Sequence, residues 1–459
     1  MKTRFINVDR DSPMLLPPDL RDWIQPDDPV HFVIEAVQQT PTDAFCVNER
    51  GSGSAQYPPS MMLALLIYCY SMGLFSSRRI ERATYRDVSV RFLTGDTHPD
   101  HDTIASFRRK NGAAISACFT QVLLLARELG LAKVGTVSVD GSHFRANASK
   151  YKNVSYGRAG ELIAELDGEI KALLERAEQA DKKDQGEDTL PRELQRLERL
   201  REKLGQARER MKERAGEQAK GREEELAKAH EEKKAQGKRT FRKKKMAQTG
   251  AESEDRTPPK TRDNLSDTDS RLMRKDGRSS YEQCYNAQAV VDAEGSQLVL
   301  SARVCQSSSD GGELVADIDA IPQELGTPRN VLADGGYASE AEVTSLEARG
   351  MSLYVNVRAE APRKHDFRPQ SSEPKRPSPT AQSEFGKRMI ALLQTETGKA
   401  LYALRKQSVE PVFGILKKNL GFTQFNLRGL NKVSLEWELL ALAYNIKRIW
   451  NMKMEKSPV

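Results

Sequence analysis

Hydrophobic and polar positions follow a helical spacing through the first part of the chain. Apolar side chains recur three or four positions apart, which is the spacing that lines one face of a helix. The pattern predicts helices over residues 27–39, 61–73, 76–85 and 102–130. Asp102 is the expected N-cap of the last one. The most apolar stretch, 61–75, is too short to cross a membrane, so we expect it to be a buried helix. Residues 1–133 are therefore predicted to form a helical N-terminal domain.

The spacing changes at Val134, where a run of β-branched residues predicts a buried strand that ends at Asp140. A strand hairpin with a glycine-containing turn follows later in the chain, and after it strands alternate with helices. We expect the later strands at 284–291, 297–304, 330–334 and 352–357, and helices at 310–321, 339–349 and 385–452. This order is typical of a ribonuclease-H-like mixed sheet flanked by helices, which is an α+β fold.

A charge-dense insertion interrupts this pattern over residues 158–280. Leucines recur at helical spacing on both sides of a break at 181–191, which predicts an antiparallel, coiled-coil-like hairpin. Apolar residues become sparse after Lys212, and a basic run covers 238–245, so we expect this half to be partly disordered. Residues 358–384 are rich in Pro, Ser, Arg and Lys and predict a flexible linker. The sheet domain is then expected to consist of residues 134–157, 281–357 and 385–455.

Composition favours a polyanionic partner and argues against several other classes of protein. The net charge is +7 and the isoelectric point is near 9.0, and a basic excess of this size favours binding to polyanions. Five scattered cysteines and six histidines show no metal-ligand spacing, so we expect reduced thiols and no zinc site. The chain begins without an apolar leader and has no glycine-rich nucleotide-binding motif, which predicts a cytoplasmic protein that does not depend on ATP or NAD.

Three carboxylates have the positions that metal-dependent phosphodiester chemistry requires. Asp140 and Asp334 each end a predicted strand before a glycine, and Glu410 lies in an amphipathic helical pattern. Taken singly, an Asp-Gly pair is usually a turn, and a Glu before a proline is usually a helix start. Magnesium prefers hard oxygen ligands, and converging carboxylates can hold it. Pro411 leaves two predictions open for Glu410, the start of a helix or a kink within one.

Several blocks of the sequence resemble those of bacterial insertion-sequence transposases that have a DDE catalytic domain. The three carboxylates lie in blocks 139–150, 332–337 and 405–414. The second-strand block is Tyr-Asn-Ala-Gln at 285–288, and residues 101–108 are similar to the end of the family's N-terminal helical domain. Together these blocks cover nearly the whole chain outside the insertion and the linker.

The resemblance implies a DNA transposase that cuts at transposon ends in a metal-dependent reaction and joins the cut strand to target DNA. The residues implied to be catalytic and to bind two Mg²⁺ or Mn²⁺ ions, called here the carboxylate trio, are Asp140, Asp334 and Glu410. The residues implied to contact DNA are Tyr402, Arg405 and Lys417. The arginine lies one position farther from the glutamate than is usual in the family, so Arg405 and Lys406 both stay open as the phosphate contact.

Double-stranded DNA is the implied partner, in the form of terminal inverted repeats and target DNA, and a homodimer associated with the nucleoid is expected. The insertion separates the first two strands, whereas in some related transposases it precedes the glutamate helix. Packing over the site, binding DNA and pairing subunits all remain open as its role. Two other functions also remain open: a catalytically inactive DNA-binding protein derived from a transposase, and a ribonuclease-H-like nuclease that cuts without joining.

Overall fold

The structure is a computed structural model that describes residues 19–47, 55–181, 190–235, 257–274, 279–357 and 379–456. The described residues form two compact units. Unit 1 comprises residues 1–144, 286–426 and 431–459, and unit 2 comprises 145–285 and 427–430, as far as each is described. The basic run 238–245 and most of the predicted linker, 358–378, lie outside the described residues.

In the described residues, six strands form one mixed sheet in the order β4-β5-β1-β7-β8, with β6 paired to β5. The strands are β1 (Thr136–Arg145), β4 (Arg271–Met273), β5 (Glu282–Asp292), β6 (Val299–Cys305), β7 (Asn330–Ala333) and β8 (Ser352–Val355). β7 is parallel to β1 and to β8, whereas β5 is antiparallel to β4 and β6. The predicted ribonuclease-H-like mixed sheet is confirmed, with the short strand β4 in addition.

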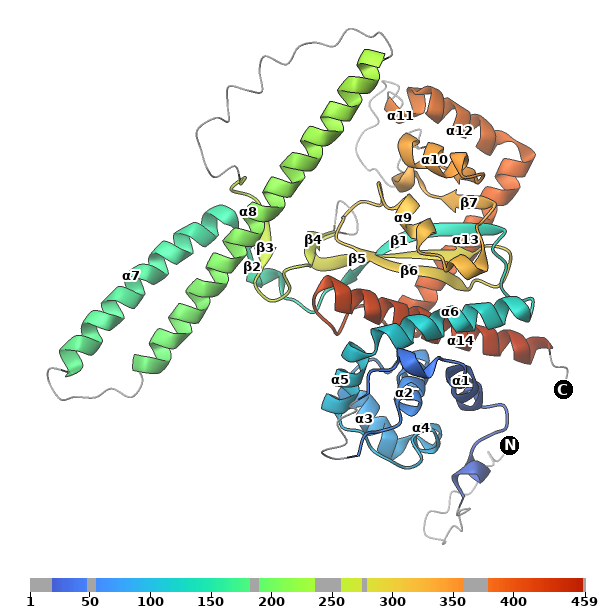
Figure 1. The fold of residues 1–459 in the computed structure, drawn as a ribbon, viewed down its shortest axis with the longest axis horizontal. Coiled ribbons are helices and arrows are strands. Elements are labelled where there is room, and N and C mark those ends of the chain that lie inside the picture. The colour runs from blue at the N-terminus through green and yellow to red at the C-terminus, as the bar shows by residue number, and fades with distance from the viewer. Residues whose placement is uncertain are drawn as a thin grey trace, which may run out of the picture. The chain divides into compact units, whose positions relative to one another are not determined.

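Helices cover the sheet and build the N-terminal part of unit 1 (Figure 1). They are α1 (Pro29–Gln38), α2 (Pro59–Ser71), α3 (Ser77–Arg86), α4 (Val88–Leu93), α5 (His101–Lys110), α6 (Gly112–Glu128), α9 (Leu314–Asp319), α10 (Glu340–Ala348), α11 (Pro379–Gln382), α12 (Glu384–Gln394), α13 (Glu396–Gly414) and α14 (Leu430–Lys456). In the view of Figure 1, α6 and α14 lie below the sheet and α10 and α12 above it. Strand β5 is buried along almost its whole length, as expected for a strand with both faces covered.

The N-terminal helices differ from the predicted pattern in two places: α4 is an additional helix, and 102–130, where one helix was expected, contains two. The break falls at Asn111, whose side chain donates to Phe107 O (3.0 Å) and accepts from Cys46 N (2.8 Å). The N-cap of α5 is Asp100 and not Asp102, because Asp100 Oδ1 accepts from Thr103 N at 2.6 Å. Local propensity alone could not separate two aspartates that lie two positions apart.

The apolar stretch predicted as a buried helix is α2, and its residues from 62 to 71 are all buried. None of the helices within the described ranges has the length and apolar character needed to cross a membrane. The five cysteines all lie in described segments, and no disulfide joins them. The prediction of a buried helix in this stretch is confirmed.

Helix α14 is fixed to the sheet by side chains that hydrogen-bond strand backbones. Asn445 both donates to the carbonyl of Val299 and accepts from its amide, each at 2.8 Å. Trp437, which is fully buried, donates its indole N–H to Gln288 O at 2.9 Å. Without these bonds the Asn445 amide and the Trp437 indole N–H would be unsatisfied in the core. The bonds therefore fix the position of α14 against the sheet.

Unit 2 contains the charged insertion, which forms the predicted helical hairpin from α7 (Tyr156–Asp181) and α8 (Leu190–Ala235). Leu166, Leu204 and Met211, from the predicted apolar stripes, lie in its buried core. Helix α8 continues well beyond Lys212, where order was expected to be lost, because the Glu, Ala and Lys residues there are good helix formers. Most of the predicted break, 182–189, lies outside the described residues.

Unit 2 also contains a two-stranded antiparallel ribbon of β2 (Asn153–Ser155) and β3 (Arg262–Asn264). Asp263 of β3 is fully buried and is paired with Arg210 Nη2 (2.8 Å) and Arg214 Nη2 (2.7 Å) of α8. A buried carboxylate requires such partners, so this pairing holds the ribbon against the helix.

A buried polar network joins the N-terminal helices to α14 within unit 1. Arg108 of α5 donates to Tyr70 OH (2.6 Å) and Phe75 O (3.0 Å), and its Nη1 lies 3.7 Å from Glu436 Oε1. Glu436 has no exposed surface and accepts from Tyr70 OH and from the backbone and side chain of Asn426. Removing one charge from such a network leaves the opposite charge uncompensated in the core.

We therefore predict that Arg108→Met lowers the free energy of unfolding by about 3–5 kcal/mol, the usual cost of breaking a buried pair. Urea denaturation followed by circular dichroism measures the change. The control is Arg109→Met, an exposed neighbour on the same helix, for which a change of at most about 0.5 kcal/mol is expected. Equal effects of the two substitutions would show that the network does not stabilise the fold.

Candidate active site

Asp140 and Asp334 lie on adjacent parallel strands at the same level. The pairing of β1 with β7 places Thr136 opposite Asn330 and Ser138 opposite Leu332. Continued by two residues, this register brings Asp140 level with Asp334. The sheet thus brings together two carboxylates that are far apart in the sequence.

The two aspartates are held differently by the backbone. β1 does not end at Asp140 as predicted but continues to Arg145, because β5 flanks it and Phe144 is buried in an aromatic cluster with Phe413 and Trp437. Asp334 follows directly after β7, as predicted, and its Oδ1 accepts from Gly336 N at 2.6 Å. One carboxylate therefore projects from within a strand and the other caps a turn.

Glu410 lies in the last turns of α13, so the prediction of a helix start is wrong and Pro411 lies inside the helix. A proline there cannot donate to the carbonyl four residues earlier, which belongs to Gln407. Gln297 compensates for this loss, since its side-chain amide donates to Gln407 O at 2.7 Å. Closer to the sheet, the buried Ser408 donates to Ser138 Oγ of β1 at 2.8 Å, which fixes this face of the helix against β1.

Arg405 lies among the carboxylate trio. Its Nη2 is 3.2 Å from Asp140 Oδ2 and 4.0 Å from Asp334 Oδ2, and its Nη1 is 3.2 Å from Glu410 Oε1. Arg405 is buried, whereas Lys406 is exposed. Of the two residues left open by the sequence, Arg405 is therefore the one that faces the site.

The carboxylates keep an excess of negative charge even with this guanidinium between them. Burial raises the pKa of Asp140 to about 6, Arg405 opposes that rise, and Asp334 and Asp310 add to it. The Nε of Arg405 is buried with no hydrogen-bond partner in the described part of the chain. A buried carboxyl with a raised pKa beside further acids is typical of a functional site.

The donor set fits a hard divalent cation. In the described segments, no three His, Cys, Asp or Glu side chains are arranged closely enough to hold a metal ion. Arg405 instead contacts all three members of the carboxylate trio, and their oxygens are the ligand type that Mg²⁺ and Mn²⁺ prefer. In this structure the Arg405 guanidinium is the cation that the three carboxylates share.

Tyr402 and Lys417, the other predicted DNA contacts, lie near the site in different environments. Tyr402 packs against a small cluster that includes Leu332 and Tyr354, and burial raises its pKa. Lys417 lies in a π-helical turn, Ile415–Asn419, that directly follows α13. Its ammonium donates to His143 O at 3.0 Å and stands 4.2 Å from the centre of the Phe144 ring. Lys417 thus contacts β1.

Sequence reasoning missed Asp310, Asn286 and Gln288 as parts of the site. Both amides donate to Asp310 Oδ1, at 2.8 Å and 2.9 Å. The Tyr-Asn-Ala-Gln block contained the two amides but gave them no role. The signal that could have found Asp310 is an acidic residue in a Ser- and Gly-rich turn after β6.

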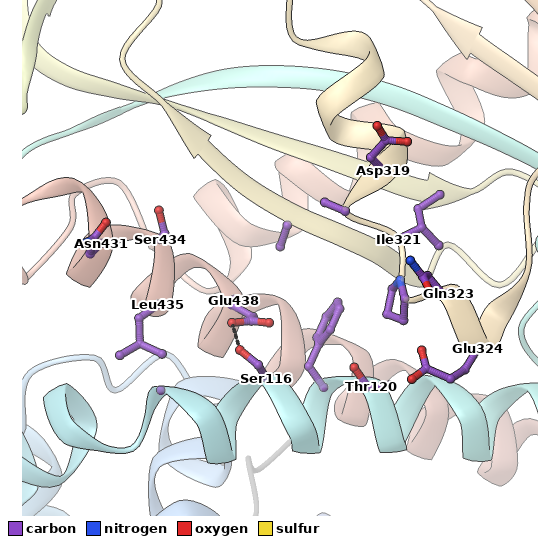
Figure 2. Close-up of a pocket in the computed structure, with 15 residues that line it drawn as sticks. Ser116, Thr120, Asp319, Ile321, Gln323, Glu324, Asn431, Ser434, Leu435 and Glu438 are labelled. Atoms are coloured by element: carbon purple, nitrogen blue, oxygen red, sulfur yellow. Dashed lines mark hydrogen bonds between the residues drawn. The ribbon is translucent and has the colours of Figure 1, made fainter. Parts of the chain in front are cut away.

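A large cavity elsewhere in unit 1 is not this site. It has a volume of about 620 Å³ and lies between α6, α14 and the segment that follows α9. Figure 2 shows Ser116 and Glu438 facing each other across it, with Ser116 Oγ donating to Glu438 Oε2 at 2.6 Å. None of the carboxylate trio, Tyr402, Arg405 or Lys417 lines it.

Comparison with known protein families agrees with this geometry. The model described as a transposase DDE domain matches residues 254–446, which include Asp334, Glu410 and Arg405. A second model, described as a transposase domain (DUF772), matches residues 18–110 in the N-terminal helices. The chain belongs to the insertion-sequence transposases with a DDE domain. No curated protein and no solved structure matches this transposase.

The site of the transposase is closely packed around Gly141. A Cβ at this position would stand 2.4 Å from Asp310 Oδ1 and 2.4 Å from Gln288 Nε2. We predict that Gly141→Ala lowers the free energy of unfolding by about 1–3 kcal/mol through overpacking. The control, Gly414→Ala, adds a methyl group where nothing lies within 4 Å and should be neutral or stabilising, by up to about 1 kcal/mol. Thermal denaturation of both variants tests this, and a neutral Gly141→Ala would contradict the packing.

Replacing Arg405 should expose the mutual repulsion of the carboxylate trio. We predict that Arg405→Met lowers the free energy of unfolding by about 1–3 kcal/mol without divalent metal, since charged groups lose their partner. Mg²⁺ or Mn²⁺ should then raise the melting temperature of the variant more than that of the unsubstituted protein, because no guanidinium competes for the carboxylates. Lys406→Met, an exposed neighbour, is the control. Equal stabilisation of all three proteins by metal would contradict the competition.

Proposed function

We propose that this transposase cuts DNA at the ends of its transposon in a metal-dependent reaction and joins the freed 3′ end to target DNA. The observation that carries the proposal is the convergence of Asp140, Asp334 and Glu410 on Arg405, at 3.2 Å, 4.0 Å and 3.2 Å. Rigid elements supply each of them, two from adjacent strands and one from α13. Three carboxylates held in this way suit phosphodiester chemistry, in which little besides positioning and charge stabilisation is required.

In this proposal the carboxylate trio holds two Mg²⁺ or Mn²⁺ ions. Such a pair of ions activates the attacking oxygen and stabilises the leaving oxygen of a phosphodiester. The chain's own contribution is to orient the carboxylates. Ser408 fixes the face of α13 against β1, and the strand register keeps Asp140 level with Asp334.

Arg405, Tyr402 and Lys417 are proposed to contact the DNA backbone. A guanidinium pairs with phosphate oxygens as readily as with carboxylates, often through two parallel hydrogen bonds. In this scheme metal binds to the carboxylates first, and Arg405 exchanges its carboxylate partners for a phosphate when DNA then binds. The phosphate contact brings the scissile bond to the carboxylates and reads no sequence.

Sequence-specific recognition is assigned to the N-terminal helices, whose match to a transposase domain supports a role in binding terminal inverted repeats. An α-helix fits the major groove, where each base pair presents a distinct pattern of donors and acceptors. We further propose that the transposase acts as a homodimer, with one subunit for each end of the transposon. The charged hairpin of unit 2 is then free to pack on DNA or on the second subunit.

The test is nicking and joining of a labelled duplex that carries the inverted repeats flanking the gene. We expect Mg²⁺-dependent nicking and strand transfer by the unsubstituted protein, and loss of both, by at least about 100-fold, in Asp334→Ala, which lacks a charge-stabilising group. Asp319→Ala serves as the matched control, because Asp319 is half exposed and pairs with Arg349.

Each outcome separates one of the open functions. Equal nicking by Asp334→Ala would overturn the enzymatic proposal. Specific DNA binding without any nicking would identify an inactive DNA-binding derivative. Nicked products without joined strands, after analysis on a denaturing gel, would identify a nuclease that does not transfer strands.

A further inference from the structure

A fourth carboxylate, Asp310, lies beside the carboxylate trio on the segment between β6 and α9. This segment is held in place by Glu342 of α10, which accepts from Gly312 N (3.0 Å) and Val315 N (3.2 Å). The backbone of Glu313 also donates to Asp310 O at 3.3 Å, closing a turn. Asp310 is therefore placed by a hydrogen-bonded loop and by a neighbouring helix.

The two oxygens of Asp310 have different environments. Oδ1 accepts from Asn286 Nδ2 and Gln288 Nε2, both on β5, at 2.8 Å and 2.9 Å. Gln288 is itself fixed, since its Oε1 accepts from Tyr337 OH. Within the described residues, Oδ2 accepts no hydrogen bond from the protein. One oxygen thus anchors the side chain, and the other keeps its full capacity to bind a cation.

The glycines that follow the two aspartates show where this second oxygen lies. A Cβ on Gly336 would stand 3.2 Å from Asp310 Oδ2 and 2.8 Å from Asp334 Oδ1. A Cβ on Gly141 would stand 2.4 Å from Asp310 Oδ1. The two carboxylates therefore border one small space, and a Cβ at either glycine would displace the side-chain ends that line it. Two carboxylate oxygens that border one space repel each other unless a cation or a proton lies there.

A second oxygen near Asp310 also lacks a partner. Asn286 is almost fully buried, with 1% of its surface exposed, and its Oδ1 has no hydrogen-bond partner in the described part of the chain. Native proteins rarely leave a buried polar atom unsatisfied, so this oxygen has the capacity to accept from a water or to bind an ion. Carboxylate and amide oxygens are both hard ligands of the kind Mg²⁺ takes, directly or through its waters.

We propose that Asp310 is a fourth carboxylate ligand of the divalent-metal site, added to the trio from the β5 side of the sheet. This inference rests on the proposed function, which supplies the metal. Each Mg²⁺ ion takes six oxygen ligands, so two ions need more oxygens than three carboxylates contain. A fourth carboxylate would supply part of the remainder. Asn286 and Gln288 are then positioning residues, which hold Oδ1 and leave Oδ2 directed toward Asp334.

The test is Mn²⁺ binding by the full-length protein without DNA, measured by calorimetry and by electron paramagnetic resonance. Asp310→Asn is the informative variant, because its amide oxygen can still accept from Asn286 and Gln288 while the charge is lost. We expect it to weaken Mn²⁺ binding by about 10–100-fold, the size seen when groups of a metal site are removed. Asp334→Asn should do the same, and Asp319→Asn, at a half-exposed carboxylate, should leave binding unchanged.

The outcomes separate this inference from the function on which it rests. Unchanged Mn²⁺ binding in Asp310→Asn, with binding lost in Asp334→Asn, overturns the role of Asp310 and leaves the proposed function intact. Binding that is absent from the unsubstituted protein, or unaffected by Asp334→Asn, overturns both. Asp310→Cys gives a second readout, should Asp310→Asn fail to fold. A thiolate ligand selects soft metals, so Cd²⁺ should produce a thiolate charge-transfer absorption that Asp319→Cys lacks, and its absence overturns the inference.

Discussion

The parallel pairing of β1 with β7 is the constraint on which the site depends. A strand pair aligns residues only in discrete registers, and a shift by one position would turn every side chain to the opposite face of the sheet. With Ser138 opposite Leu332, Asp140 and Asp334 come to the same level, although a whole helical hairpin and a strand hairpin separate them in sequence. Val137, Val139, Val331 and Leu332 are all buried in this register, so the paired segments of β1 and β7 lie inside the core.

Negative charge is the second constraint. Burial is the main cause of the raised pKa of Asp140, and the neighbouring carboxylates of Asp334 and Asp310 add to the rise. The fold compensates with Arg405, whose guanidinium reaches all three members of the trio. The shared guanidinium offsets the mutual repulsion of the three carboxylates.

Helix α13 shows how a local irregularity is accommodated where the site needs it. Pro411 interrupts the helical hydrogen bonding one residue after Glu410, and Gln297, which adopts a positive φ of 59°, supplies the missing donor. A π-helical turn follows directly and brings Lys417 onto β1. Such turns are frequent at functional sites, where they reorient the side chains beyond them. Glu410 and Lys417 therefore both lie on the β1 side, although Pro411 interrupts the hydrogen bonding of α13 and the turn after it is π-helical.

The sequence alone determined the class of fold and the helical hairpin, and it predicted the three carboxylates as site residues. These features rest on hydrophobic periodicity and on short motifs, which are local properties.

The sequence could not decide that β1 continues past Asp140, because the strand is prolonged by its neighbour β5 and by the burial of Phe144. The choice between Arg405 and Lys406 also required the tertiary structure, since both are cations on one helix and only packing against the sheet distinguishes their faces. The same holds for Asp310, which is held by amides from a distant strand. Periodicity and motifs indicate which residues belong to one helix or strand. Which carboxylate oxygens lie close together depends on strand pairing and helix packing, which only the folded sheet decides.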